Sequence, residues 1–301
     1  MAKNMAFLTN LRQSAVPRLR QWRLSFYLLQ RNTLTRLSLL VVLFLILIAI
    51  FAPVLVPYPD HAINATNPAD KLLPPSGAHF FGTDEQGRDI FSRVLVGTRI
   101  SLQTALLAVG IALLIGIPLG AFAGSIGGIC DEVIMRVTDI FLSFPPLLLS
   151  IAIAALMGPN LQNAMFAIAL SWWPWYTRLI RAQAVSIKER QFVRAADAIG
   201  APLVSTIFRH IVPNCIAPVI VQASMDIGGA ILTIASLSFL GLGAQAPTPE
   251  WGLMINTSRN YLLNAWWYSI FPGLAIFITV LVFNLLGDGI REILDPKTRK
   301  L

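Results

Sequence analysis

The chain has 301 residues, of which 55% are hydrophobic and only 13% are charged. Because so few charged side chains cannot coat a soluble domain of this size, the composition predicts an integral membrane protein. The formal net charge of +8 would also suit a nucleic-acid-binding protein, but the basic residues cluster beside apolar runs. That pattern is typical of cytoplasmic loops, so we expect membrane lipid and no nucleic acid as a partner.

The N-terminal segment, residues 1–36, carries several Arg and Lys residues and no acidic residue, and the apolar run Leu37 to Val56 follows it directly. This asymmetry predicts a cytoplasmic N-terminus and a first membrane span that is too long for a signal-peptide core. Around Trp22 to Leu29 we expect an interfacial elbow helix. The remainder, residues 37–301, is predicted to be one transmembrane domain.

Further apolar runs predict five more spans. They are Ser101 to Phe122, Val137 to Met157, Asn163 to Ile180, Ala217 to Leu242 and Trp266 to Leu286. The prolines Pro145 and Pro146 should kink the second of these runs. The aromatic residues Trp266, Trp267 and Tyr268 are expected in a belt at the membrane surface. The sequence therefore predicts an all-α, polytopic protein with six transmembrane helices and both termini in the cytoplasm.

Three glycines, Gly116, Gly120 and Gly124, recur at four-residue intervals in the run from Ser101 onward. Small residues at this spacing allow two helix backbones to approach closely in lipid. The pattern predicts a helix-packing face.

A polar, basic segment from Arg181 to Pro213 separates two apolar runs and is predicted to lie in the cytoplasm. Its apolar residues at helical spacing predict a short amphipathic helix; they are Phe192, Ala195, Ala196 and Ile199. Gly200 should end this helix with a positive φ, and a second short helix should end at Pro213. The segment is either a docking element or a loop that only joins two helices.

Charged residues in two other places are candidates for function. Asp84, Arg88, Asp89 and Arg93 fall close enough in an outer turn to pair with one another, and we expect them to orient that turn rather than to contact a substrate. Gln222 and Asp226 lie in the fifth predicted span, where an ionisable group is costly and faces a partner helix or a water-filled path. Structural pairing and cargo contact both remain open for Asp226.

No catalytic constellation is present in the sequence. The residues His61, His79 and His210 are scattered, and no glycine-rich nucleotide-binding loop of the Walker type occurs. Cys130 and Cys215 show no metal-ligand spacing, so we expect free thiols and no metal site. The chain is not expected to be an enzyme, and the lack of an internal repeat suggests half of a translocation pathway.

Three irregular strings carry a family resemblance. They are Phe81 to Arg93 (FGTDEQGRDIFSR), Leu237 to Gln245 (LSFLGLGAQ) and Asn284 to Arg291 (NLLGDGIR). In order and spacing, over about residues 75–296, the sequence resembles the C-type permease subunit of the dipeptide, oligopeptide and nickel ABC importers. The cytoplasmic segment resembles the "EAA" loop of these permeases, with Arg194 in place of the family's Glu.

This resemblance implies a type I ABC importer permease fold in the bacterial inner membrane. It also implies that the coupling residues seat in a groove of an ATPase; these would be Phe192, Arg194, Ala195, Ala196, Ile199, Gly200 and Pro213. Expected partners are a B-type permease, two ABC ATPase subunits and an extracytoplasmic solute-binding protein. ATP and Mg²⁺ would bind to the ATPases, with no cofactor in this chain.

The resemblance is compatible with several kinds of cargo. A peptide is favoured because a metal pathway would be expected to show pore-facing His or Met. Nickel, a metal chelate, an opine or another small solute remain alternatives within the family. A membrane enzyme or scaffold without transport activity is the remote alternative.

Overall fold

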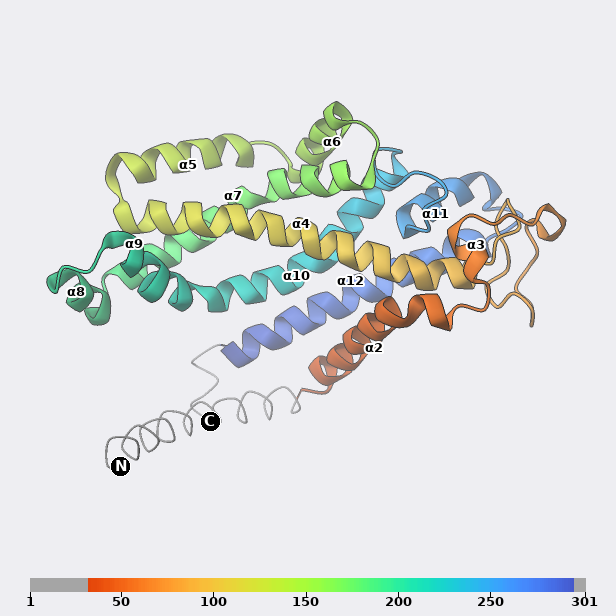
Figure 1. Ribbon diagram of the computed structural model, residues 1–301, viewed down its shortest axis with the longest axis horizontal. Coiled ribbons are helices and arrows are strands. Elements are labelled where there is room, and N and C mark those ends of the chain that lie inside the picture. The colour runs from red at the N-terminus through yellow and green to blue at the C-terminus, as the bar shows by residue number, and fades with distance from the viewer. Residues whose placement is uncertain (1–31, 295–301) are drawn as a thin grey trace, which may run out of the picture.

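The computed structural model describes residues 32–294, which form long helices running roughly side by side (Figure 1). Within this range the β-structure is limited to one isolated bridge between Thr83 and Asp89. The expected elbow helix at Trp22 to Leu29 and the last basic residues of the tail lie outside the described residues. The prediction of an all-α chain is confirmed for residues 32–294.

The helices are, in chain order, α2 (Thr33–Leu55), α3 (Pro59–Ile63), α4 (Ile90–Ile126), α5 (Gly128–Leu142), α6 (Pro146–Met157), α7 (Leu161–Lys188), α8 (Gln191–Ala198), α9 (Leu203–Thr206), α10 (Val212–Phe239), α11 (Trp251–Ser258) and α12 (Trp267–Leu294). Short 3₁₀ turns occupy Pro68–Asp70 and Arg259–Tyr261, and a π-helical turn occupies Ile207–Ile211.

Four helical runs among the described residues are long and apolar enough to cross a membrane. They are α2, α4, the run Leu203–Phe239 and α12. The bent pair α5 and α6 would make a fifth span if both helices count as one. The helix α7 is long, but it contains several polar and charged residues, among them Arg178 and Arg181, and is less apolar than the other four. The structure therefore supports four to five apolar spans.

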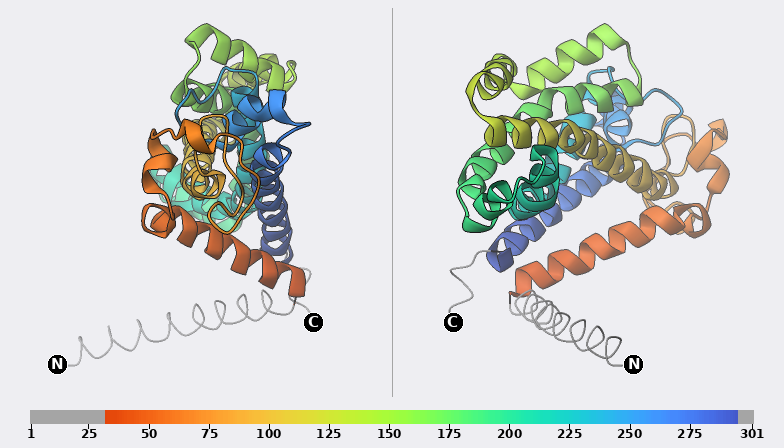
Figure 2. Two further views of the ribbon diagram at one scale, coloured as in Figure 1. Left: turned by 90° about the vertical axis from the view of Figure 1, so that its right-hand side faces the viewer. Right: turned by 60° about the vertical axis from the view of Figure 1, so that its left-hand side comes forward.

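The predicted kinked span Val137 to Met157 is wrong in its details. The glycines Gly127 and Gly128 both have positive φ and turn the chain sharply after α4, so α5 begins at once and doubles back. The break before Pro146 then bends α6 by 87° relative to α5. Figure 2 shows this pair on the edge of the bundle opposite α2.

The prediction that Pro213 ends a short helix is also wrong. Pro213 lies in the first turn of α10, directly after a π-helical turn. The π-helical turn Ile207–Ile211 joins α9 to α10 without a break, so the fifth apolar run begins at Leu203. The proline is thus accommodated within the long helix.

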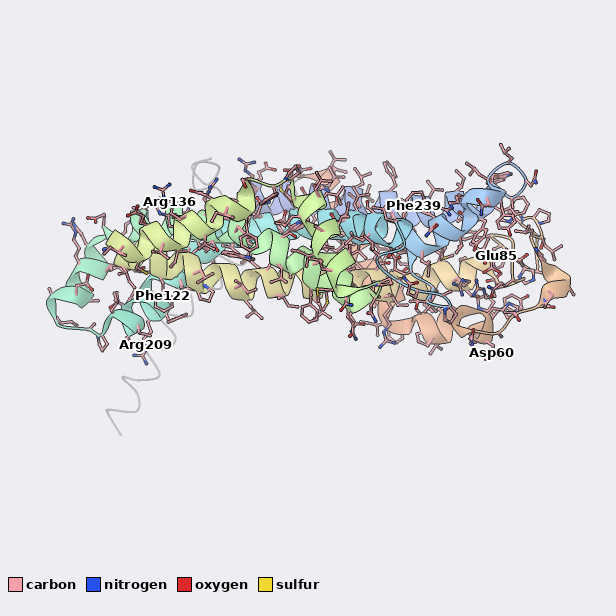
Figure 3. The ribbon with its side chains drawn as sticks, turned by 90° about the horizontal axis from the view of Figure 1, so that it is seen from above. Asp60, Glu85, Phe122, Arg136, Arg209 and Phe239 are labelled. Carbon is pink, nitrogen blue, oxygen red and sulfur yellow. The ribbon has the colours of Figure 1, made fainter. Side chains whose placement is uncertain are left out.

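Both ends of the described chain meet at one end of the bundle. The Asn32 side-chain amide, at the start of α2, donates a hydrogen bond of 3.3 Å to the Glu292 carboxylate near the end of α12. The α8 and α9 segment lies at the same end, and α3 and α11 lie at the other end (Figure 1). Figure 3 likewise places Arg209 and Phe122 far from Asp60 and Phe239. We call these the α8 end and the α11 end.

The aromatic residues at the start of α12 do not form the expected surface belt. Trp266 is exposed, but Trp267 and Tyr268 are buried. The indole nitrogen of Trp267 donates to the Thr83 carbonyl at 3.4 Å, and the Tyr268 hydroxyl lies 2.7 Å from the Thr257 hydroxyl. These side chains pack inside the protein because the connecting segments at the α11 end fold over them.

Candidate functional site

The segment predicted to be cytoplasmic, Arg181 to Pro213, forms a helical hairpin that projects from the α8 end. Helix α8 is attached to the chain by Val193 and Ala196, which are buried. On its other side, Phe192 and Ile199 are 44% and 85% exposed, and Ala195 is exposed as well. The hairpin therefore presents a shallow apolar surface with no cover from residues 32–294; we call Phe192, Ala195 and Ile199 the α8 face.

Ala196 does not belong to the α8 face, contrary to its expected position. Val193 belongs to the hydrophobic cluster that contains Ile187 and Ile207, and Ala196 is buried as well. The spacing of apolar residues could not distinguish the buried side of α8 from its exposed side, because apolar residues occur around more than half of this short helix. The role of Val193 as the inward anchor was not predicted.

Gly200 ends α8 through backbone hydrogen bonds. Its φ is +75°, its N–H donates to the Asp197 carbonyl, and the Ala201 N–H donates to the Ala196 carbonyl, each at 3.0 Å. This pattern is a Schellman motif, which requires a left-handed residue at the position of Gly200. No atom lies within 4 Å of a Cβ built there, so the backbone conformation, not crowding, favours glycine.

Arg194 points away from the α8 face and forms an ion pair with Glu189. The guanidinium holds the pKa of the Glu189 carboxyl below its usual value of 4.5. Both side chains are largely exposed, so water screens the pair and it contributes little to stability. The nearest charged partner of Arg194 is thus a residue that precedes α8 in the chain.

A second group of polar residues lies in the middle of the bundle, around Asp226 on α10. The Tyr176 hydroxyl on α7 donates to one carboxylate oxygen at 2.5 Å, and the Gln222 side-chain amide donates to the other at 2.9 Å. Both oxygens therefore have a donor, which offsets much of the cost of placing a carboxylate here. Tyr176 was not predicted, because nothing in its sequence neighbourhood indicates a partner fifty residues away.

The Asp226 carboxylate also lines a cavity of about 300 Å³. Its walls come from the break between α5 and α6, from α7 and from α10; they include Leu142, Pro146, Trp172, Trp175 and Gln222. The cavity thus combines one carboxylate with two tryptophan side chains. An ammonium group suits such surroundings, because a carboxylate and the face of an aromatic ring both attract cations.

The charged outer turn forms a buried network at the α11 end. Asp84 accepts a hydrogen bond of 2.6 Å from the Arg88 guanidinium, and the Arg93 guanidinium lies 3.7 Å from the same oxygen. Asp89 does not pair with either arginine. It instead caps α4 through the Ser92 N–H at 2.8 Å and contacts the His79 ring at 2.9 Å.

This network also joins two distant segments of the chain. Arg93 donates to the Pro247 carbonyl at 3.2 Å, which ties the segment before α11 to the start of α4. Asp84, Arg88, Asp89 and Arg93 are all buried. The structure thus brings together three of the four predicted residues as an ion-pair group and places Asp89 beside it with His79.

The three glycines of α4 all lie against α7. A Cβ at Gly116, Gly120 or Gly124 would stand 2.6 Å from the Tyr176 Cβ, 2.4 Å from the Thr177 carbonyl or 2.7 Å from the Arg181 carbonyl, respectively. The backbones of α4 and α7 therefore touch over two turns. This contact also fixes the position of Tyr176 beside Asp226.

Comparison with known proteins gives the class to which this chain belongs. Residues 116–300 match the family of binding-protein-dependent transport system inner membrane components, and residues 20–75 match the N-terminal transmembrane domain of oligopeptide transport permease C. The chain belongs to this family of ABC importer permeases. It is an inner membrane transport component, and its relatives are permeases rather than enzymes.

Three relatives show the range of the family. The probable D,D-dipeptide transport system permease protein DdpC of Escherichia coli strain K12 is 50% identical over 271 residues, or 90% of each chain. The dipeptide transport system permease protein DppC of Alkalihalophilus pseudofirmus is 48% identical over 278 residues, covering 92% of this chain and 90% of the relative. The nickel transport system permease protein NikC of E. coli K12 is 41% identical over 273 residues, covering 91% and 97%.

A solved structure supports the fold. An inward-facing structure of the MetNI methionine ABC transporter contains a chain that matches with a TM-score of 0.55 and 17% identity, covering 67% of this chain and 96% of that one. At this identity the likeness concerns the fold alone. It agrees with an ABC importer permease fold for the helices described above.

Proposed function

We propose that this chain forms half of the translocation pathway of a peptide importer. Through the α8 face it would transmit the energy of ATP hydrolysis to that pathway. The observation that carries the proposal is the uncovered surface of Phe192, Ala195 and Ile199 on a helix that is anchored by its opposite side. A helix of this length has little stability of its own. The buried residues of α8 and the Schellman motif at its C-terminus therefore hold it in place, as a helix that moves together with a bound partner requires.

The partners follow from the class of importer. A binding-protein-dependent ABC importer needs ATPase subunits and a solute-binding protein, and the α8 face is the surface that we assign to an ATPase. A B-type permease would complete the pathway beside this chain. ATP and Mg²⁺ would remain on the ATPases. Phe192, Arg194, Ala195, Ile199, Gly200 and Pro213 stay candidate coupling residues, with Ala196 as an inward support.

Six membrane crossings remain our proposed topology. The four apolar runs supply four crossings, the bent pair α5 and α6 supplies one, and α7 supplies the sixth despite its lower apolar content. Close packing of α4 on α7 would shelter the polar side of α7 from lipid. An even number of crossings agrees with the contact between Asn32 and Glu292. The α8 end would then be cytoplasmic, together with both termini.

Peptide is the proposed cargo. Two of the relatives are named as D,D-dipeptide and dipeptide permeases, at 50% and 48% identity. The Asp226 cavity is suited to the ammonium group of a peptide, and Gln222 would share that contact. Nickel is the second candidate, because a relative at 41% identity is a nickel permease.

The test is ATP-driven uptake by the complete importer in proteoliposomes, with its own binding protein. Radiolabelled dialanine should accumulate, and ⁶³Ni²⁺ should not. Asp226→Asn should lower dipeptide uptake while the complex purifies intact, because the neutral amide no longer attracts an ammonium group. Accumulation of nickel without dipeptide would reject the peptide assignment, and normal dipeptide uptake by Asp226→Asn would reject a cargo role for that residue.

A further inference from the structure

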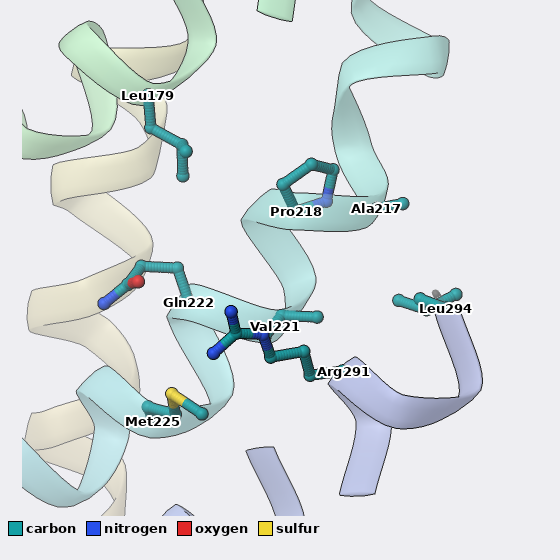
Figure 4. Close-up of a pocket in the computed structure, with 8 residues that line it drawn as sticks. All are labelled: Leu179, Ala217, Pro218, Val221, Gln222, Met225, Arg291 and Leu294. Atoms are coloured by element: carbon teal, nitrogen blue, oxygen red, sulfur yellow. The ribbon is translucent and has the colours of Figure 1, made fainter. Parts of the chain in front are cut away.

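A second cavity, of about 400 Å³, shares the lining residue Gln222 with the Asp226 cavity. It is lined by α7, α10 and α12 through Leu179, Ala217, Pro218, Val221, Gln222, Met225, Arg291 and Leu294. Figure 4 shows the Arg291 guanidinium extending from α12 toward Gln222 and Met225. Apart from Gln222 and Arg291, the lining side chains are apolar.

Arg291 is the only charged side chain among these lining residues. Within residues 32–294, no carboxylate forms an ion pair with it, as carboxylates do with Arg136, Arg178, Arg181 and Arg194. Arg291 is itself exposed, and a guanidinium that borders apolar side chains can bind a carboxylate through two parallel hydrogen bonds. The cavity therefore offers an unfilled site for an anion.

We propose that this cavity binds the carboxylate of the cargo at Arg291. Gln222 borders both cavities, so a solute that leaves the Asp226 cavity along α10 meets Arg291 next. A zwitterion with an ammonium group and a carboxylate at its two ends, such as a short peptide, matches this order of charges. The inference rests on the proposed peptide cargo. It adds selection for the carboxylate of the solute to the selection for its ammonium group at Asp226.

The electrostatic part of the proposal is tested by the charge preference of a thiol in the cavity. The importer complex would carry Val221→Cys in a chain whose Cys130 and Cys215 are replaced by alanine. The probes are an anionic and a cationic methanethiosulfonate of similar size. The ratio of anionic to cationic labelling rates should fall at least about fivefold in Arg291→Gln. It should persist in Arg291→Lys and in the exposed control Arg136→Gln.

The ligand part is tested by protection of the same thiol. Dialanine should slow labelling, and its C-terminal amide should not, because the amide lacks the carboxylate. This comparison needs no change at Arg291, so it holds even if Arg291→Gln fails to assemble. Equal protection by the two compounds, or an unchanged labelling ratio in Arg291→Gln, would overturn the proposal. If phosphatidylglycerol in the membrane abolishes the anion preference and dialanine gives no protection, Arg291 binds a lipid headgroup. That result would also overturn the proposal.

These outcomes differ from a failure of the proposed function. If the importer accumulates dialanine but the labelling tests are negative, the peptide assignment stands and the Arg291 site is rejected. If dialanine is not transported but Val221→Cys keeps its Arg291-dependent anion preference, the peptide assignment falls, and the binding of a peptide carboxylate at Arg291 falls with it, although the cavity still attracts anions.

Discussion

Among the three glycines of α4 that face α7, Gly120 leaves the least room, because a Cβ there would stand 2.4 Å from the Thr177 carbonyl oxygen. Gly120→Ala should therefore separate the helices and destabilise the protein by about 1–3 kcal/mol. Gly110→Ala on the same helix is the matched control, since no atom lies within 4 Å of its Cβ. The measurement is the thermal unfolding midpoint of the purified complex, and equal midpoints for both variants would contradict the packing described.

The Arg88 guanidinium is buried with Asp84, and its removal would leave a carboxylate without its closest partner. Arg88→Met should cost about 3–5 kcal/mol, the usual penalty for breaking a buried ion pair from one side. The exposed pair of Arg136 and Glu132 offers a control, because Arg136→Met should change stability by less than about 1 kcal/mol. Chemical unfolding that shows no difference between the two variants would mean that the outer network is not structural.

The sequence could predict these residues only in part. The four-residue spacing of Gly116, Gly120 and Gly124 predicts a packing face, but it does not identify α7 as the partner helix. Asp226 is conspicuous in an apolar run, yet Tyr176 is hidden among other aromatic residues because its partner is distant in sequence. The charged string near Asp84 predicts an ion-pair group, but the histidine that contacts Asp89 lies outside that string.

At the scale of elements, the cap of α11 gives a pH-dependent test. The Glu250 carboxylate accepts the N–H groups of Gly252 and Leu253 at 2.9 Å, and it is 1% exposed. Burial raises the pKa of this carboxyl above its usual 4.5. The folded protein therefore keeps the proton to a higher pH than the unfolded chain, and the stability that this proton contributes is lost as the pH rises through the folded pKa.

Glu250→Gln keeps an acceptor oxygen but cannot ionise. The unfolding free energy of the Glu250 protein relative to the Gln variant should accordingly fall as the pH rises above 4.5. The measurement is the difference in unfolding midpoints across this range, in which other titrating groups cancel. A difference that rises with pH would show that the backbone N–H groups favour the ionised form more than burial opposes it.

Element boundaries separate what the sequence predicts well from what it does not. Long apolar runs locate α2, α4 and α12 because their burial in lipid follows directly from composition. The two prolines at residues 145 and 146 predict a kink, but only the positive φ values at Gly127 and Gly128 determine that α5 doubles back. In the sequence, Pro213 looks like the end of a helix. In the structure, the π-helical turn before it connects α9 to α10, so the helix continues.

At the scale of the whole molecule, the six-crossing topology predicts which surfaces face each side of the membrane. Single cysteines at Thr66 and Leu263, both exposed at the α11 end, should react in intact cells with a reagent that does not cross membranes. A cysteine at Ser186, near the α8 end, should react only after the cells are opened. Labelling of Ser186→Cys in intact cells would place the α8 end outside and would exclude ATPase docking there.

The central claim is that the α8 face transmits the energy of ATP hydrolysis to the pathway. The most direct measurement is the stimulation of ATPase activity by loaded binding protein in the reconstituted importer. Ala195→Trp adds bulk to an exposed and shallow surface, so it should overpack the ATPase contact at a cost of about 1–3 kcal/mol and abolish stimulation. Ala195→Ser keeps the side chain small and should retain it. If Ala195→Trp keeps full stimulation and uptake, the α8 face is not the coupling surface.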